Sequence, residues 1–185
     1  MPGLIDSHVH LAMDVGAADD ASAVYWNPGG LAWSKKHSVS LMHAILVEDI
    51  SYDWLGYVQP LGAGTFGAGL QRLSYGSLTG TDATGLETSG FSPAETAATL
   101  SYGIGFGDFG IGGGLKYISG KIKRSASAVA PDLGVNYHTS PESASSMEDA
   151  DYSRFSFGFA LRNLGGKIKY VSAADPLPLT LKAGA

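Results

Sequence analysis

The sequence predicts an all-β protein: an antiparallel, partial transmembrane β-barrel of about eight strands, preceded by a short helical segment. Three observations lead to this prediction. Apolar residues recur at every second position from residue 37 onward, which is the period of a strand. Glycine accounts for 26 of the 185 residues and charged residues for only 16%, so the chain is richer in small residues and poorer in charge than an average soluble protein. Long polar connections are interspersed with very short turns.

The alternation is cleanest in three segments, which we expect to be strands. Residues 152–162 read YSRFSFGFALR, with aromatic and aliphatic side chains on one face and small or charged ones on the other. Residues 96–106 and 109–121 follow the same scheme, with many glycines opposite the apolar positions. The dipeptide Gly107-Asp108 between the last two segments predicts a tight hairpin.

Five further strands complete the predicted sheet. In the segment 62–75 the alternation changes phase at Arg72 and Leu73, which predicts a β-bulge. The remaining strands are expected at residues 38–47, 50–59, 131–138 and 177 to the end.

Connection lengths and aromatic positions favour a membrane barrel over a soluble β-sandwich, which would show the same alternation. Outer-membrane barrels have long loops at one end and short turns at the other. Here 76–95 and 163–176 are long and 59–63 and 107–108 are short, although 48–49 and 139–151 break the scheme. Aromatic residues near strand ends are expected to form the belts of the two membrane interfaces: Tyr25, Trp26, Trp54, Tyr57, Tyr75, Tyr102, Tyr117, Tyr152 and Tyr170.

Composition excludes several other classes of protein. No apolar run approaches the roughly 18 residues of a membrane helix. The net charge is −5, and one small basic cluster at Lys121, Lys123 and Arg124 is too narrow a surface for nucleic acid. Cysteine is absent, which excludes thiolate catalysis, cysteine zinc sites and disulfides. The first residues do not form a signal peptide. If the protein is exported, we therefore expect its true start to lie further upstream.

The segment at residues 16–41 carries a specific motif. It reads GAADDASAVYWNPGGLAWSKKHSVSL, with an acidic pair, Ala-Ser-Ala, an aromatic pair and Asn-Pro-Gly-Gly-Leu. This resembles the N-terminal signature of the PorV/PorQ-type proteins, a branch of the FadL-like (long-chain fatty-acid transporter-like) outer-membrane barrels. Position 29 is glycine where alanine is more usual. The resemblance continues through PDLGVNYH, FGFALRNLGGKIKY and DPLPLTLKAG, and so covers roughly residues 16–185.

The matching residues have clear local roles. Asp19 and Asp20 can cap a short helix, and their negative charges are favourable at a helix N-terminus. Asn27, Pro28 and Gly29, followed by a second glycine, stop that helix. In FadL-like barrels the corresponding segment folds inward as a plug near the periplasmic mouth, and the resemblance implies that role for this motif.

The resemblance also implies a chain that is cut short, because the barrels of the family are larger. We therefore expect an open barrel with an unpaired edge. The expected organisation is a foreign or disordered head over residues 1–15, a plug segment over 16–36 and the barrel over 37–185.

The head carries a metal-site motif, DSHVH, with Asp6, His8 and His10. On an extended strand the two histidines project to the same side, where two imidazoles can hold Zn²⁺. The stretch resembles the first-strand motif of the amidohydrolase superfamily, whose (β/α)8 barrel needs further ligands on later parallel strands. No such βα alternation follows, so His8 and His10 are expected to bind metal weakly at most.

Two other patterns receive structural interpretations. Residues 103–114, GIGFGDFGIGGG, are similar to a Gly-rich phosphate loop, but such a loop lies between a strand and a helix. Here two strands flank it, so the glycines are expected to be small inward-facing strand positions. His43 and His138 are single histidines within strands and are expected to pack or to face the lumen.

Taken together, these features predict a non-enzymatic protein of the bacterial outer membrane, in contact with membrane lipid and without a cofactor or a nucleic-acid partner. The resemblance implies passage of hydrophobic small molecules through the barrel, or a secretion role in which the barrel receives exported proteins and hands them on. Two alternatives stay open: a metal-dependent amidohydrolase fragment that uses His8 and His10, and a soluble β-sandwich binding module.

Overall fold

The computed structural model describes residues 20–47, 49–82, 84–122, 125–138, 156–169 and 174–184. The α-helix α1 (Ala23–Trp26) and the 3₁₀-helix η2 (Pro28–Trp33) come first, and no described helix is long and apolar enough to cross a membrane. The strands are β1 (Ser38–Ile45), β2 (Ser51–Pro60), β3 (Thr65–Ser74), β4 (Leu78–Thr81), β5 (Glu87–Phe91), β6 (Ala94–Phe106), β7 (Phe109–Lys121), β8 (Ser125–His138), β9 (Ser156–Arg162), β10 (Lys167–Ile168), β11 (Asp175–Pro176) and β12 (Thr180–Gly184).

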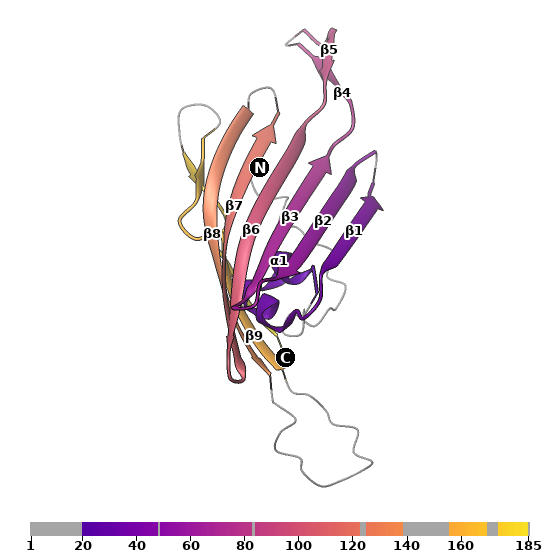
Figure 1. Cartoon of the computed structure of the whole chain (residues 1–185). Helices are drawn as coiled ribbons and strands as arrows, with labels where there is room; N and C mark the ends of the chain where they lie inside the picture. Colours follow the sequence, from indigo (N-terminus) through magenta and orange to yellow (C-terminus); the bar gives the residue numbers. More distant parts are fainter. Residues whose placement is uncertain are drawn as a thin grey trace.

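Eight strands form one antiparallel sheet in the order β1-β2-β3-β6-β7-β8-β9-β12. The sheet curls into a half-barrel (Figure 1), with β1 and β12 at its two ends. The predicted hairpin joins β6 and β7, where Phe106 pairs with Phe109 and Gly107 takes the left-handed φ of 57° that such a turn requires. The all-β class, the antiparallel pairing and the open eight-stranded sheet are therefore confirmed.

The two faces of the sheet differ in the side chains they carry. We call the face that packs against α1 and η2 the inner face, and the opposite face the outer face. These two helices contact β2, β3, β6, β7, β8 and β9, so the sheet curves around them and the inner face is concave. Along β8 every second residue from Ala126 to Asn136 is buried and the residues between them are exposed.

The outer face carries the apolar half of each alternation. Leu100 on β6, Leu115 on β7 and Leu133 on β8 are 59%, 56% and 52% exposed. The apolar faces predicted for these strands are thus confirmed, and they point away from α1 and η2. Other exposed apolar side chains in outward positions are Val39, Leu41, Ile45, Leu55, Leu70, Tyr102, Phe106, Phe109, Ile111, Tyr117, Val129, Val135, Phe157, Phe159 and Leu181.

The inner face carries small and polar side chains. Gly103, Gly110 and Gly112 are buried there, as predicted for the glycine-rich run, whereas Gly113 occupies an outward position between Tyr102 and its β8 neighbour. Buried polar residues on the inner face include Gln71, Thr99, Ser101, Lys116, Asp132, Asn136 and Arg162.

Two predicted details of the strands are wrong. β3 pairs in continuous register with β2 and β6 from Thr65 to Ser74, so the predicted bulge at Arg72 and Leu73 is absent. Arg72 faces outward and is exposed, while Leu73 faces inward and is 5% exposed. β8 begins at Ser125, well before the predicted start at 131. The prediction missed this first part of the strand because alanines fill its inner face there and give little contrast between the two faces.

The predicted aromatic belts are wrong for three residues. Tyr25 and Trp54 are 9% and 8% exposed and form a core cluster with Trp26 between α1 and the inner face. Tyr102 and Tyr117 do lie on the outer face, 43% and 51% exposed. Of the other residues predicted for the belts, Tyr57 faces outward on β2, Tyr75 lies between β3 and β4, and Tyr152 and Tyr170 lie outside the described residues.

The connection at residues 76–95, predicted as a polar loop, contains the two-stranded arm β4–β5, which projects beyond the sheet (Figure 1). Oδ1 of Asp82 organises the turn of this arm. It accepts hydrogen bonds from the backbone N–H groups of Thr84 and Leu86 at 2.8 and 3.0 Å, and from the Thr84 hydroxyl at 2.6 Å. These bonds, that of the Thr84 hydroxyl first, hold the pKa of Asp82 below its ordinary value of 3.8.

The arm is expected to depend on the charge of Asp82. Because the turn binds the carboxylate form, the contribution of Asp82 to the stability of the arm is present above pH 3.8 and is lost as the pH falls through the lowered pKa. We expect Asp82→Ala to speed amide hydrogen exchange at Thr84 and Leu86 at neutral pH, with Asp82→Asn closer to the parent chain. Exchange in β6 and β7 serves as the internal control, and unchanged exchange at Leu86 in Asp82→Ala would contradict this role.

Candidate functional site

The candidate site is the contact between the inner face and residues 20–34, which we call the N-terminal segment. Oδ1 of Asp20 accepts a hydrogen bond from the backbone N–H of Ser22 at 2.8 Å, just ahead of α1. α1 ends at Trp26, as the Asn-Pro-Gly-Gly motif predicts, and the chain then continues as the 3₁₀-helix η2. The other acidic residue of the motif, Asp19, lies outside the described residues.

Four inward glycines on β6, β7 and β8 lie directly against Asn27 and η2 of the N-terminal segment. Gly103, Gly112 and Gly134 are direct cross-strand neighbours on β6, β7 and β8, and Gly110 occupies the next inward position on β7. A Cβ added at Gly103 or Gly110 would lie 2.7 or 2.5 Å from the nearest atom of the segment, and one at Gly112 or Gly134 would overlap it. We call these four residues the glycine seat, since only glycine allows so close an approach of two backbones.

Asn27 joins the N-terminal segment to the sheet. Its side chain is fully buried. Oδ1 accepts a hydrogen bond from the N–H of Gly29 at 2.9 Å, which caps η2. Nδ2 donates to the carbonyl of Val135 on β8 at 3.0 Å. Pro28 follows at the first position of η2, where its missing N–H costs no hydrogen bond.

A group of buried charges lies on the same face. Nζ of Lys116 on β7 is 3.0 Å from Oδ2 of Asp132 on β8 and donates to Oδ1 of Asn163 at 3.0 Å. The backbone N–H of Asn163 donates to the other carboxylate oxygen of Asp132 at 2.8 Å. Nε of Arg162 lies 3.9 Å from Asp132 Oδ2. We call Lys116, Asp132, Arg162 and Asn163 the inner charge cluster. The Asp132 carboxylate at its centre contacts groups from two other parts of the chain, β7 and the end of β9.

The inner charge cluster reaches the N-terminal segment through cation–π contacts. The guanidinium carbon of Arg162 lies 4.3 Å from the centre of the Tyr25 ring. Nζ of Lys182 on β12 lies 4.4 Å from the Trp26 ring centre and 5.7 Å from that of Tyr25. Because these groups are buried or half-buried, each contact is worth on the order of 1–2 kcal/mol. The aromatic pair of the motif is therefore held by cations from β9 and β12.

The residues predicted as metal ligands, His8 and His10, lie outside the described residues, as does Asp6. Within the described ranges, no group of three or more His, Asp or Glu side chains is placed to hold a metal ion. His138 packs as predicted, with its ring centre 4.7 Å from that of Trp33. The expectation for His43 is wrong: it lies on the outer face, 61% exposed, with Nδ1 2.6 Å from Oδ1 of Asp53.

The inner charge cluster was not predicted from the sequence. A signal for it exists, because Lys116, Asp132 and Arg162 all occupy the inward parity of their strands, among glycines and alanines. A charge at such a position is buried by the fold and needs a partner. The partners come from strands far apart in the chain, so the pairing itself could not be derived from local spacing.

The model of a family described as an uncharacterised protein family, UPF0164, matches residues 10–176. The match includes the N-terminal segment, the glycine seat and the inner charge cluster, and it begins after Asp6 and His8. No curated protein matches the chain.

Proposed function

This chain belongs to the uncharacterised protein family UPF0164, and from that premise we propose that it is an outer-membrane β-barrel protein and not an enzyme. Its outer face would contact lipid, and the N-terminal segment would occupy the interior as a plug. The described half-barrel would be part of the membrane-embedded wall of the barrel.

The observation that carries the proposal is the distribution of apolar side chains. Water-soluble sheets turn their apolar faces toward a core, whereas Leu100, Leu115 and Leu133 are more than half exposed and the buried face holds Lys116 and Asp132. A contiguous exposed apolar surface over many strands marks a contact with lipid or with protein. A polar interior and an apolar exterior on alternate residues are the pattern of membrane barrels.

The height of the apolar surface supports the same proposal. From Phe109 to Tyr117 on β7 the outward apolar positions span eight residue steps, about 27 Å at ~3.4 Å per residue. With the ~40° tilt usual in membrane barrels this is about 20 Å along the barrel axis, close to the ~25 Å apolar band of such proteins. Beyond Tyr117 the outward residues turn polar, with Thr96, Ser119 and Ser127 in direct cross-strand register.

The role within the membrane rests on the resemblance to FadL-like and PorV/PorQ-type barrels: passage of hydrophobic molecules, or a part in protein secretion. The described inner wall favours the second role. Thr99, Ser101 and Lys116 face inward, and an apolar molecule gains nothing from a lining of hydroxyl and charged groups. A seated N-terminal segment also narrows the interior.

The alternatives fit the described residues less well. A soluble β-sandwich would cover the apolar faces of β6, β7 and β8 with a second sheet, yet these faces are exposed. An amidohydrolase barrel needs parallel strands, and every described strand pair in the large sheet is antiparallel.

The test uses depth-dependent substitution on β7. In phosphatidylcholine vesicles, Leu115→Arg is expected to lower the free energy of unfolding by about 2 kcal/mol, because a charge would face lipid inside the apolar band. Ser119→Arg, beyond the edge of the band, is expected to cost roughly 0–1 kcal/mol. Urea unfolding of the vesicle-bound chain measures both. A chain that remains monodisperse without detergent, or equal effects at the two positions, would overturn the proposal.

A further inference from the structure

One glycine of the outer face, Gly113, lies at a position that does not require glycine. In the apolar part of β6, β7 and β8, the outward positions hold side chains except at Gly113. This glycine lies in register between Tyr102 on β6 and Leu133 on β8. Its φ is not in the left-handed region. A Cβ added there would meet its nearest atoms, Cδ2 of Leu133 and the carbonyl of Asp132, at 3.7 and 3.8 Å, which is ordinary contact.

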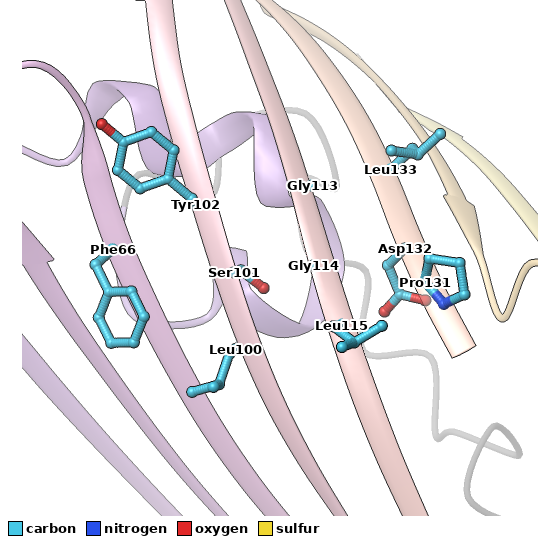
Figure 2. Close-up of a pocket in the computed structure, with 10 residues that line it drawn as sticks. All are labelled: Phe66, Leu100, Ser101, Tyr102, Gly113, Gly114, Leu115, Pro131, Asp132 and Leu133. Atoms are coloured by element: carbon cyan, nitrogen blue, oxygen red, sulfur yellow. The ribbon is translucent and has the colours of Figure 1, made fainter. Parts of the chain in front are cut away.

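A wide, open hollow in the outer face includes Gly113. Its volume is about 430 Å³, and its walls include Phe66, Leu100, Tyr102, Leu115 and Leu133. Figure 2 shows these side chains on both sides of Gly113. The walls come from β3, β6, β7 and β8, four neighbouring strands that span roughly 14 Å at ~4.8 Å per step.

We propose that this hollow is a binding site for one acyl chain of a membrane lipid. The inference rests on the proposed function, since it requires the outer face to lie in the bilayer. It goes beyond that function because it assigns one lipid a fixed position on the β6–β8 wall. The rest of the outer face would contact lipid that exchanges freely.

The charge and the size of the hollow favour an acyl chain as its occupant. Asp132 borders it, but its carboxylate is 4% exposed and lies 3.0 Å from Lys116 Nζ on the inner face, so the walls that face outward are uncharged. The hollow of about 430 Å³ is open along the outer face and has walls from four strands, so it has room for a run of several methylene groups. A single side chain from a second copy has far fewer carbons and would leave most of the hollow unfilled.

The experiment maps contacts of a photoreactive lipid. The full chain is reconstituted in dioleoylphosphatidylcholine vesicles that contain a phosphatidylcholine with a diazirine in its acyl chain, then irradiated and analysed by peptide mass spectrometry. Adducts at Leu100, Leu115 and Leu133 are expected about fivefold above those at Leu70 and Phe159, a preference equal to the burial of one to two more methylene groups. Gly113→Leu should reduce the excess to the level of the rest of the face.

The outcomes separate this inference from the proposed function. Thermal unfolding of Gly113→Leu should match the parent chain, since the position has room. If the vesicle-bound protein is labelled evenly over the outer face, or if Gly113→Leu keeps the same excess of adducts as the parent chain, the acyl-chain site is overturned and the membrane barrel is retained. If Gly113→Leu abolishes a chemically cross-linked dimer and leaves the lipid adducts unchanged, the hollow is a contact with a second copy, and the acyl-chain site is overturned as well. A chain that does not associate with vesicles overturns both.

Discussion

Asp132→Ala is expected to lower the free energy of unfolding by about 3–5 kcal/mol, the cost of removing one partner of a buried ion pair. The Asp132 carboxylate is the acceptor for Lys116 Nζ at 3.0 Å and for the backbone N–H of Asn163 at 2.8 Å. Its loss leaves Lys116, 4% exposed, without its closest opposite charge. Thermal or urea unfolding in detergent micelles measures the effect.

Two further variants test the cause of that loss. The double variant Lys116→Met with Asp132→Leu removes both charges and is expected to recover much of the stability, because well-packed apolar side chains replace a buried pair at little cost. Asp53→Asn is the matched control, since it breaks the exposed pair with His43, whose side chains are 61% and 49% exposed, and should cost under about 1 kcal/mol. Equal losses in Asp132→Ala and Asp53→Asn would contradict a buried cluster.

The strand pattern could be predicted from sequence because it depends on local geometry alone. A strand turns alternate residues to opposite faces, so Leu100 had to lie opposite Thr99, and Leu115 opposite Lys116. Which of these faces is buried does not follow from alternation, because a sandwich and a membrane barrel show the same period. The structure answers this for the described residues: the leucines are exposed and Lys116 is buried.

The predicted bulge is wrong because the polarity of the two faces changes along β3. Arg72 and Leu73 were interpreted as a bulge because a charged residue took an apolar parity. In the structure Arg72 is the direct cross-strand neighbour of Asp53 and Thr96, all three outward. The switch therefore marks the end of the apolar band on β3, at an unchanged register. Similar switches on other strands are a sequence signal for the edge of the band.

The candidate site was predictable in its motif and unpredictable in its partners. Asn27 and Pro28 were predicted as a helix stop, and the glycines of residues 103–114 as small inward-facing positions. Such positions either line a lumen or allow a close backbone approach. Only the tertiary structure joins the two observations, because the glycine seat comes from β6, β7 and β8. Tyr25 and Trp54 were misplaced in the belts for a related reason: position near a strand end does not distinguish a ring that faces lipid from one that packs on α1.

Gly112→Ala and Gly134→Ala are expected to displace the N-terminal segment from the inner face. A Cβ at Gly112 would overlap the carbonyl of Pro28, and one at Gly134 would overlap the Asn27 side chain. The backbone of a strand paired on both sides cannot move away without breaking its ladder, so the segment must yield. We expect a loss of about 3 kcal/mol, the upper part of the usual range for overpacking, together with loss of the hydrogen bond from Asn27 Nδ2 to Val135.

The readout that distinguishes displacement from general unfolding is limited proteolysis of the N-terminal segment. Both variants should be cut near Lys35 and Lys36 much faster than the parent chain while the strand content measured by circular dichroism is retained, because β6–β8 pair through their own backbones. Gly113→Ala is the matched control: it lies next to Gly112 on the same strand but faces outward, with its nearest neighbour at 3.7 Å, and should leave both stability and cleavage unchanged. If Gly112→Ala and Gly113→Ala behave alike, the glycines of the inner face are a lumen lining, and the close approach of the N-terminal segment to the sheet does not exist in the molecule.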